Sequence, residues 1–166
     1  MKELIAEVTK NDKFLRLKSK AEFYENPELI HRTASLLLFN DKQELMLRKI
    51  AQRGRGALDL YDFSVTGTVA GESYKSCLER AIREELGIEL KITELFKFFY
   101  EDYLGRCFNT VFVVEQFCEP QNLIIKSDAI RWISLATLKK DLKQFEERFD
   151  PQFIQGVTKY LDANLN

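Results

Sequence analysis

The fold of this chain is decided by Gly71-Glu72-Ser73, by Arg80, and by Glu84-Glu85-Leu86-Gly87-Ile88. One glutamate precedes a short amphipathic segment, a pair of glutamates stands near its end, and an arginine lies between them. Carboxylate oxygens are the ligands that hard divalent cations take, and such cations bridge to phosphates. The spacing therefore predicts a loop-helix-loop that gathers carboxylates around a cation. Position 81, where a third helix carboxylate would share the same face, holds Ala81.

The segment between these glutamates has the pattern of a helix over residues 74–86. Ser73 is suited to cap its N-terminus, and Gly87 is suited to end it. Leu78, Ile82 and Leu86 recur at four-residue spacing. One face of this helix is therefore expected to be buried in the core.

The electrostatics of such a site favour a bound ion. Carboxylates packed together repel and raise one another's pKa, and a magnesium ion removes that cost while leaving open positions for a diphosphate. Arg80 is expected to pair with Glu72 and hold the loop against the helix. The plainer interpretation is that Glu84 and Glu85 belong to a solvated helix face.

Length and composition indicate one domain over residues 1–166 that can bury a core. The net charge of -1 gives no basic field for nucleic acid. Cys77, Cys107 and Cys118 are too few and too irregular for a disulfide framework or a zinc site, and His31 is the single histidine. The charged start and the lack of a long apolar run predict neither a signal peptide nor a membrane span, so the cytoplasm is the expected location.

Strands are expected to surround the predicted helix, with two further helices at the end. The strand patterns cover residues 4–8 and 14–18 as a hairpin, and 33–39, 45–48, 61–66, 92–100, 108–117 and 129–133. Ser134 and Asp150-Pro151 open the two final helices. This order predicts a mixed sheet with helices packed on it.

The central stretch resembles the signature of the Nudix family. That signature is Gly, five residues, Glu, seven residues, Arg-Glu, an aliphatic residue, one residue, Glu-Glu, one residue, Gly and an aliphatic residue. The residues in register are Glu72, Arg80, Ile82, Glu84, Glu85, Gly87 and Ile88. Two positions depart from it, because Thr66 stands in the place of the leading glycine, one residue before Gly67, and Ala81 stands in the place of the glutamate after Arg80.

The resemblance continues outside this box. His31-Arg32-Thr33-Ala34, residues 36–40 and 44–47, and Asp62-Phe63-Ser64 look like the subgroup related to isopentenyl-diphosphate isomerase. Arg131-Trp132-Ile133-Ser134 is similar to the usual family ending, in which a strand and a tryptophan precede a capped helix.

The resemblance implies an α/β/α sandwich, in which residues 1–30 form a hairpin and lead-in, 66–88 the box and 134–165 the C-terminal helices. It implies a pyrophosphatase activity, namely Mg²⁺- or Mn²⁺-dependent hydrolysis of a nucleoside diphosphate linked to another moiety. The partner is then a small-molecule diphosphate, rather than nucleic acid or a membrane, and the oligomeric state is open.

The family pattern also assigns roles to the box residues. Glu84 and Glu85 would be metal ligands, Arg80 would orient Glu72, and Glu72 would support the loop or the metal. Glu84, Glu85 and Arg80 are thus the expected catalytic residues.

Two alternatives remain beside the hydrolase. A binding protein that keeps a weak metal or diphosphate site but has lost turnover is suggested by Ala81, because many family members use a glutamate there as a ligand. An isomerase is disfavoured because Ser64-Val65-Thr66 occupies the place of the required cysteine and the chain lacks further histidines.

Weaker candidates lie outside the box. Cations that could hold the substrate's phosphates or its leaving group are Arg48, Lys49, Arg53 and Arg55. Acidic residues that could act as the general base, whose place varies in the family, are Glu101, Asp102 and Glu115. Each cation also has a plainer interpretation as solvated surface charge. His31 is interpreted as a histidine at a strand start with ordinary hydrogen bonds.

Overall fold

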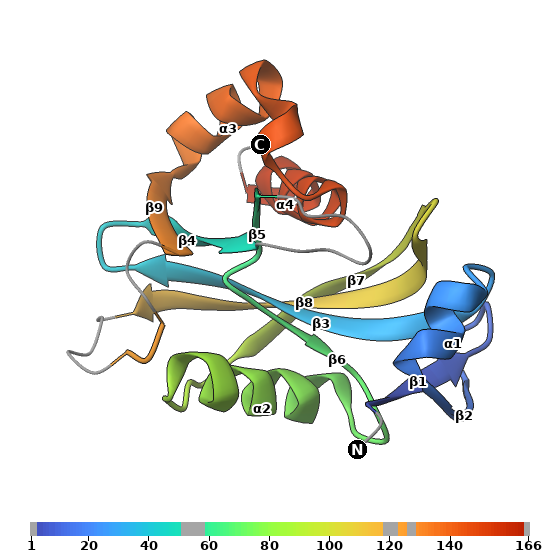
Figure 1. The fold of residues 1–166 in the computed structure, drawn as a ribbon. Coiled ribbons are helices and arrows are strands. Elements are labelled where there is room, and N and C mark those ends of the chain that lie inside the picture. The colour runs from blue at the N-terminus through green and yellow to red at the C-terminus, as the bar shows by residue number, and fades with distance from the viewer. Residues whose placement is uncertain (1–2, 51–58, 118–122, 126–128, 165–166) are drawn as a thin grey trace.

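The computed structural model describes residues 3–50, 59–117, 123–125 and 129–164. Within these residues the strands join in one mixed sheet with helices on both faces (Figure 1). Helix α2 (Tyr74–Leu86) covers one face, whereas α3 (Leu135–Gln144) and α4 (Pro151–Asn164) lie on the other. The expected α/β/α sandwich is therefore confirmed.

The strands are β1 (Leu4–Val8), β2 (Phe14–Ser19), β3 (Ile30–Asn40), β4 (Glu44–Ile50), β5 (Leu60–Asp62), β6 (Val65–Thr68), β7 (Thr93–Asp102), β8 (Gly105–Phe117) and β9 (Ile130–Ser134). The long strand β3 is central, since it pairs with β8 in parallel and with β6 in antiparallel orientation. Its side chains are buried on both faces from Thr33 to Phe39, as the continuous apolar run predicts. Strand β4 meets β3 near its end and carries β5 and β9 on its own edges.

The core has two apolar clusters, one on each face of the sheet. The α2 side contains Leu78, Ile82 and Leu86, all fully buried as predicted from their spacing. The other side joins β3, β4, β7 and β8 to Phe153 and Val157 of α4. Both faces of the sheet are thus covered, which fixes α2 and its carboxylates against β6.

The strand predicted over 61–66 is wrong, because the structure divides it into β5 and β6. Between them the Phe63 ring packs edge-on against Phe153 of α4, with centroids 5.2 Å apart. The Ser64 hydroxyl donates to the Met46 carbonyl at 2.7 Å and accepts from the Leu38 amide at 2.9 Å. The chain therefore passes at Ser64 from pairing with β4 to pairing with β3.

Two further elements differ from expectation. The strands predicted over 92–100 and 108–117 both extend into the segment between them, which is reduced to a tight turn. In this turn Asp102 Oδ1 accepts from the amides of Leu104 at 2.8 Å and Gly105 at 3.2 Å. A short helix, α1 (Lys20–Glu25), follows β2 where none was predicted. Residues 51–58, which include Arg53 and Arg55, lie outside the described residues, as does Cys118. Among the described helices, none has the length and apolar character needed to cross a membrane.

Candidate active site

The box forms the predicted loop-helix-loop on β6 and α2. Ser73 caps α2 by accepting a hydrogen bond from the Ser76 amide at 3.1 Å. Gly87 ends the helix in the left-handed conformation at φ 73°, where a glycine carries no steric cost. These two ends fix which residues of the helix face the preceding loop.

One arginine joins two of the box carboxylates. Arg80 donates from Nη2 to Glu72 Oε1 at 2.7 Å and from Nε to Glu72 Oε2 at 3.3 Å. Its Nη1 lies 3.3 Å from Glu84 Oε2, one helical turn further on. The hydrogen bonds from Arg80 lower the pKa of Glu72, and the same contact raises the pKa of Arg80. The predicted pairing of Arg80 with Glu72 is present in the structure.

The third carboxylate, Glu85, is held from a different element. Arg48 of β4 donates from Nη1 to Glu85 Oε2, across 37 positions of sequence. Their side chains are 31% and 26% exposed. Burial lowers the pKa of Arg48, while the negative charge of Asp62, its partner in the β4–β5 register, acts to raise it. Two guanidinium groups therefore contact the three glutamates.

Ala81, the residue after Arg80, lies on the buried side of α2. It is 3% exposed and packs where β6 approaches α2. At Gly67 of β6 an added Cβ would lie 2.8 Å from Cys77 Sγ and 3.2 Å from Ala81 Cβ, so only glycine allows this approach. Burial raises the pKa of Cys77 to about 12, with a further contribution from Glu72, so this thiol stays protonated near neutral pH. Cys77 is thus a buried, packed residue between α2 and β6.

The box carboxylates line a pocket of about 560 Å³, here called the carboxylate pocket. It is formed by Glu3, Leu4, Lys20, Thr66, Gly67, Thr68, Ala70, Gly71, Glu72, Arg80, Ala81, Glu84 and Glu85. A second cavity of about 320 Å³, here called the groove, adjoins it. The two share Lys20, Thr66 and Thr68, which therefore mark their common border.

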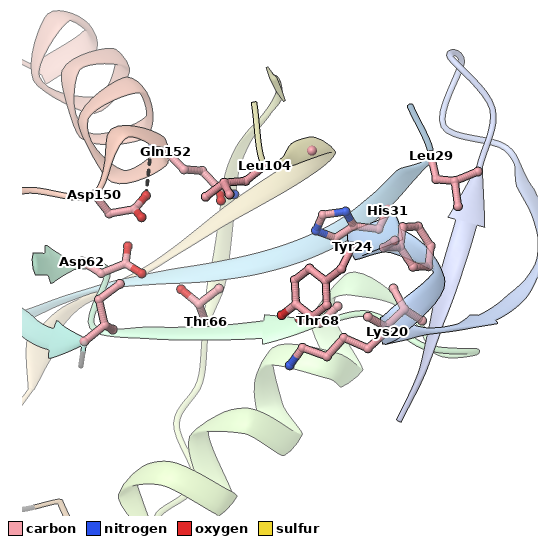
Figure 2. Close-up of a pocket in the computed structure, with 14 residues that line it drawn as sticks. Lys20, Tyr24, Leu29, His31, Asp62, Thr66, Thr68, Leu104, Asp150 and Gln152 are labelled. Carbon is pink, nitrogen blue, oxygen red and sulfur yellow. Dashed lines mark hydrogen bonds between the residues drawn. The ribbon is translucent and has the colours of Figure 1, made fainter. Parts of the chain in front are cut away.

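The groove is lined by apolar and acidic side chains. Figure 2 shows Tyr24 and His31 on one side and Asp62, Asp150 and Gln152 on the other. Its remaining lining includes Ile5, Phe23, Leu29, Ile50 and Leu104. The carboxylates of Asp62 and Asp150 are directed toward each other at one end (Figure 2). His31 contacts Phe23 edge-on, with ring centroids 5.5 Å apart.

Of the other predicted cations, the structure describes only Lys49, and Lys49 does not reach this site. Lys49 pairs with Asp59, with Nζ 2.6 Å from Oδ2. Arg53 and Arg55 lie outside the described residues. Arg48 alone of this set reaches a box carboxylate in the part of the chain that the structure describes.

The three predicted general bases lie apart from the box carboxylates. Glu101 is in β7 and pairs with Arg106 at 3.1 Å. Asp102 stabilises the β7–β8 turn and accepts from the Tyr100 hydroxyl at 2.8 Å. Glu115 is exposed on β8. Burial raises the pKa of Tyr160 in α4, and the negative charge of Glu115 raises it further. Glu115 therefore lies on the sheet face opposite α2. None of these placements supports a role at the carboxylate pocket.

Sequence reasoning missed Lys20, which begins α1 and borders both cavities. A signal for it was present, because Ser19 and Glu22 form a capping box in which Glu22 accepts from the Ser19 amide at 2.8 Å. Asp62 and Asp150 were also missed as cavity residues. They come together only through the passage of the chain from β5 to β6 and the start of α4, which no local pattern predicts.

The donors suit the divalent ion that the resemblance implies. Glu72, Glu84 and Glu85 supply hard carboxylate oxygens around one cavity, which is the chemistry that Mg²⁺ and Mn²⁺ take. Among the described residues, however, no three acidic, histidine or cysteine side chains converge as a ready-made metal cluster. Arg80 contacts both Glu72 and Glu84, whereas Arg48 contacts Glu85.

Comparisons with known proteins agree with this fold. The family model described as NUDIX domain matches residues 29–153. A relative from Methanosarcina mazei, the prenyl-diphosphate phosphatase, is 31% identical over 94% of this chain and 94% of its own. The isopentenyl-diphosphate Delta-isomerase of Serratia proteamaculans is 24% identical over 99% of this chain and 94% of its own. The crystal structure of DR0079 from Deinococcus radiodurans superposes with a TM-score of 0.73 and 20% identity, over 95% of this chain and 98% of that one.

An α/β/α sandwich that presents carboxylates from a loop-helix-loop defines a class of hydrolases that act on pyrophosphate bonds. The chain belongs to the Nudix family, since the family model and a relative above 30% identity both cover most of it. The subgroup seen in the sequence is also found among the relatives, through the isomerase.

Proposed function

We propose that this chain hydrolyses the diphosphate of a small molecule with the help of a bound Mg²⁺ or Mn²⁺ ion. The diphosphate lies in the carboxylate pocket and the organic group lies in the groove. One observation carries this assignment: Lys20, Thr66 and Thr68 line both cavities, so a single molecule can pass from one to the other. At that border Lys20 offers an ammonium group, and the two threonines offer hydroxyl groups to phosphate oxygens.

Glu84 and Glu85 would hold the ion, with Glu72 as a third oxygen donor. When bound, the ion neutralises charge that develops on the phosphate oxygens while water attacks phosphorus. Arg80 positions Glu72 and Glu84 through its three short contacts. The closed packing of Gly67 against Cys77 holds β6, and with it Thr66 and Thr68, at a fixed distance from these carboxylates.

The groove favours an organic group that is largely apolar. Ile5, Phe23, Leu29 and Leu104 supply hydrocarbon surface, and burial of such surface stabilises an apolar group by about 25 cal/mol per Å². The M. mazei relative is named for prenyl diphosphates, which have this character. A nucleoside group, which the resemblance implied, is the alternative, because Tyr24 and His31 offer aromatic faces to a base.

A second candidate function rests on Ala81. This residue lines the carboxylate pocket with a methyl group where many family members place a ligand glutamate. A chain with two helix carboxylates can bind a diphosphate with its ion and turn it over slowly. Isomerase activity has less support, because the Ser64 hydroxyl is buried between the Met46 carbonyl and the Leu38 amide.

The test is an assay of diphosphate hydrolysis, read by chromatography of the phosphate-ester products, on three groups of compounds, with Mg²⁺ and then with Mn²⁺. The groups are prenyl diphosphates, nucleotide sugars with dinucleotides, and nucleoside triphosphates. We expect prenyl diphosphates to give the highest kcat/KM and Glu85→Gln to lower kcat by about 100-fold or more.

Lys139→Gln, on α3 away from both cavities, serves as the matched surface control. Equal turnover of all three groups would contradict the apolar assignment. Turnover that survives Glu84→Gln/Glu85→Gln would contradict the metal site itself. Tight binding of prenyl diphosphates without turnover would favour the second candidate.

A further inference from the structure

The ion pair between Arg48 and Glu85 joins the sheet to the box. Arg48 comes from β4, and Glu85 is the penultimate residue of α2. The contacts of Arg80 are local, because its partners are Glu72 in the preceding loop and Glu84 in the same helix. Arg48 therefore makes a long-range contact with a carboxylate that faces the pocket.

The contact of Arg48 with Glu85 competes with metal binding at Glu85. A guanidinium and a divalent cation carry like charge, so the two repel when they share one carboxylate within a few ångströms. Side chains about one-third exposed are screened only in part by water. Occupation of Glu85 by a divalent ion is thus opposed by the guanidinium that already holds it.

Arg48 has a second acidic neighbour. Asp62 stands opposite it in the β4–β5 register, and its charge acts on Arg48. Asp62 lines the groove, whereas Glu85 lines the carboxylate pocket. The Arg48 side chain therefore lies between one acidic group from each cavity.

We propose that Arg48 is a built-in counter-ion of Glu85 that competes with the divalent ion and turns toward Asp62 when the ion binds. This inference rests on the proposed function, since it takes Glu85 as a metal ligand. Arg48 is then a positioning residue. In the metal-free protein Arg48 balances the charge of Glu85. In the metal-bound protein its guanidinium lies next to Asp62 of the groove.

The test measures Mn²⁺ affinity by calorimetry or by the electron paramagnetic resonance of free Mn²⁺, without any substrate. We expect Arg48→Gln to bind Mn²⁺ about fivefold more tightly than the natural chain, because a competing ion pair of ordinary strength is lost. Arg48→Lys keeps the charge without the fork of donors and should lie between the two. Arg131→Gln is the matched control, because it breaks a similar pair with Asp141 at 3.0 Å on β9 and should leave the affinity unchanged.

A second readout guards against a folding defect. In EDTA, Arg48→Gln should melt at a lower temperature than the natural chain, and saturating Mn²⁺ should remove most of that difference. The Asp62→Asn change should weaken Mn²⁺ binding in the natural background but have little effect beside Arg48→Gln, as a double-mutant cycle reveals.

The outcomes separate the two proposals. If Mn²⁺ binds and Glu84→Gln/Glu85→Gln removes the binding, but Arg48→Gln leaves it unchanged or weaker, Arg48 is not a competitor and the metal site stands. If Mn²⁺ binds to none of these proteins, the metal site and the role of Arg48 both fail.

Discussion

Arg80 and Glu72 are joined at both ends of their charged groups, with Nη2 2.7 Å from Oε1 and Nε 3.3 Å from Oε2. They are eight positions apart in sequence, so this paired contact closes the box loop onto the first turns of α2. The side chains are 39% and 25% exposed, which leaves the pair open to screening by solvent. Its main effect is to order the loop that carries Glu72 beside the carboxylate pocket.

The first prediction concerns the pH dependence of this pair. Because its pKa is lowered in the folded chain, Glu72 adds stability above its ordinary value of 4.5, and that stability is lost as the pH falls through the lowered value. Arg80→Gln should therefore lower the free energy of unfolding by about 1 kcal/mol or less at pH 7. The difference should close in acid. Urea unfolding at pH 7 and pH 3 measures it.

The control for this change is Lys75→Gln, which removes an exposed pair with Glu79 at 3.9 Å on the same helix. It should have almost no effect at either pH. A loss of stability in Arg80→Gln that is the same at both pH values would show that the guanidinium acts through packing instead.

The second prediction concerns the approach of β6 to α2. Gly67→Ala should destabilise the chain by about 1–3 kcal/mol, because the new Cβ would stand 2.8 Å from Cys77 Sγ and something must shift. Gly71→Ala is the matched control in the loop that follows β6, since nothing lies within 4 Å of its added Cβ. Chemical unfolding of both variants at neutral pH provides the comparison.

A double variant sharpens this test. Cys77→Ala removes the sulfur and should recover part of the loss in Gly67→Ala, while Ala81 and the Cys77 carbonyl still limit the recovery. Additive effects of the two changes would mean that the strain is relieved elsewhere.

The sequence predicted the box well because its signals are local. Ser73 and Gly87 bound the helix, and the spacing of Leu78, Ile82 and Leu86 defines its buried face. A family resemblance then supplied the sandwich, which periodicity alone could not specify.

What the sequence could not supply depends on contacts between distant segments. Arg48 reaches Glu85 only because β4 and the end of α2 converge in the fold. The break at Ser64 follows from hydrogen bonds to Met46 and Leu38 on two different strands. Lys20 is a different case, because the capping box of Ser19 and Glu22 that begins its helix is a local signal, whereas its place between the two cavities is not.

The third prediction concerns the missing ligand at position 81. Ala81→Glu should increase kcat with Mn²⁺ by about tenfold or more, because a third helix carboxylate would face the carboxylate pocket. It should also cost about 1–3 kcal/mol of stability, since Ala81 is 3% exposed and close to Gly67. Ala81→Gln has the same size without the charge. Equal gains in both variants would exclude a metal-ligand role for this position.

The fourth prediction concerns Asp12, in the turn between β1 and β2. Its carboxylate accepts from Arg32 Nε at 2.6 Å, from Lys97 Nζ at 2.5 Å and from the Tyr74 hydroxyl at 3.0 Å. Burial acts to raise the pKa of Asp12, but these hydrogen bonds lower it overall. The turn is thereby fixed to β3, β7 and the first residue of α2, which keeps the N-terminal hairpin, and hence Lys20, beside the box.

Asp12→Asn should lower the free energy of unfolding by about 2–3 kcal/mol at pH 7, because Arg32 and Lys97 lose a carboxylate that is only 10% exposed. Asparagine adopts the left-handed conformation at φ 58° as readily as aspartate does. The loss of stability therefore comes from the removed charge and not from strain in the turn. The loss should shrink as the pH falls and Asp12 in the natural chain becomes protonated, since a carboxylate with a lowered pKa stabilises the fold only while it is ionised.

Asp41→Asn, in the exposed β3–β4 turn, is the matched control and should change stability by less than about 0.5 kcal/mol. If Asp12→Asn also raises the KM for prenyl diphosphates while kcat holds, the hairpin acts on substrate binding through Lys20, whereas unchanged kinetics would confine Asp12 to stability.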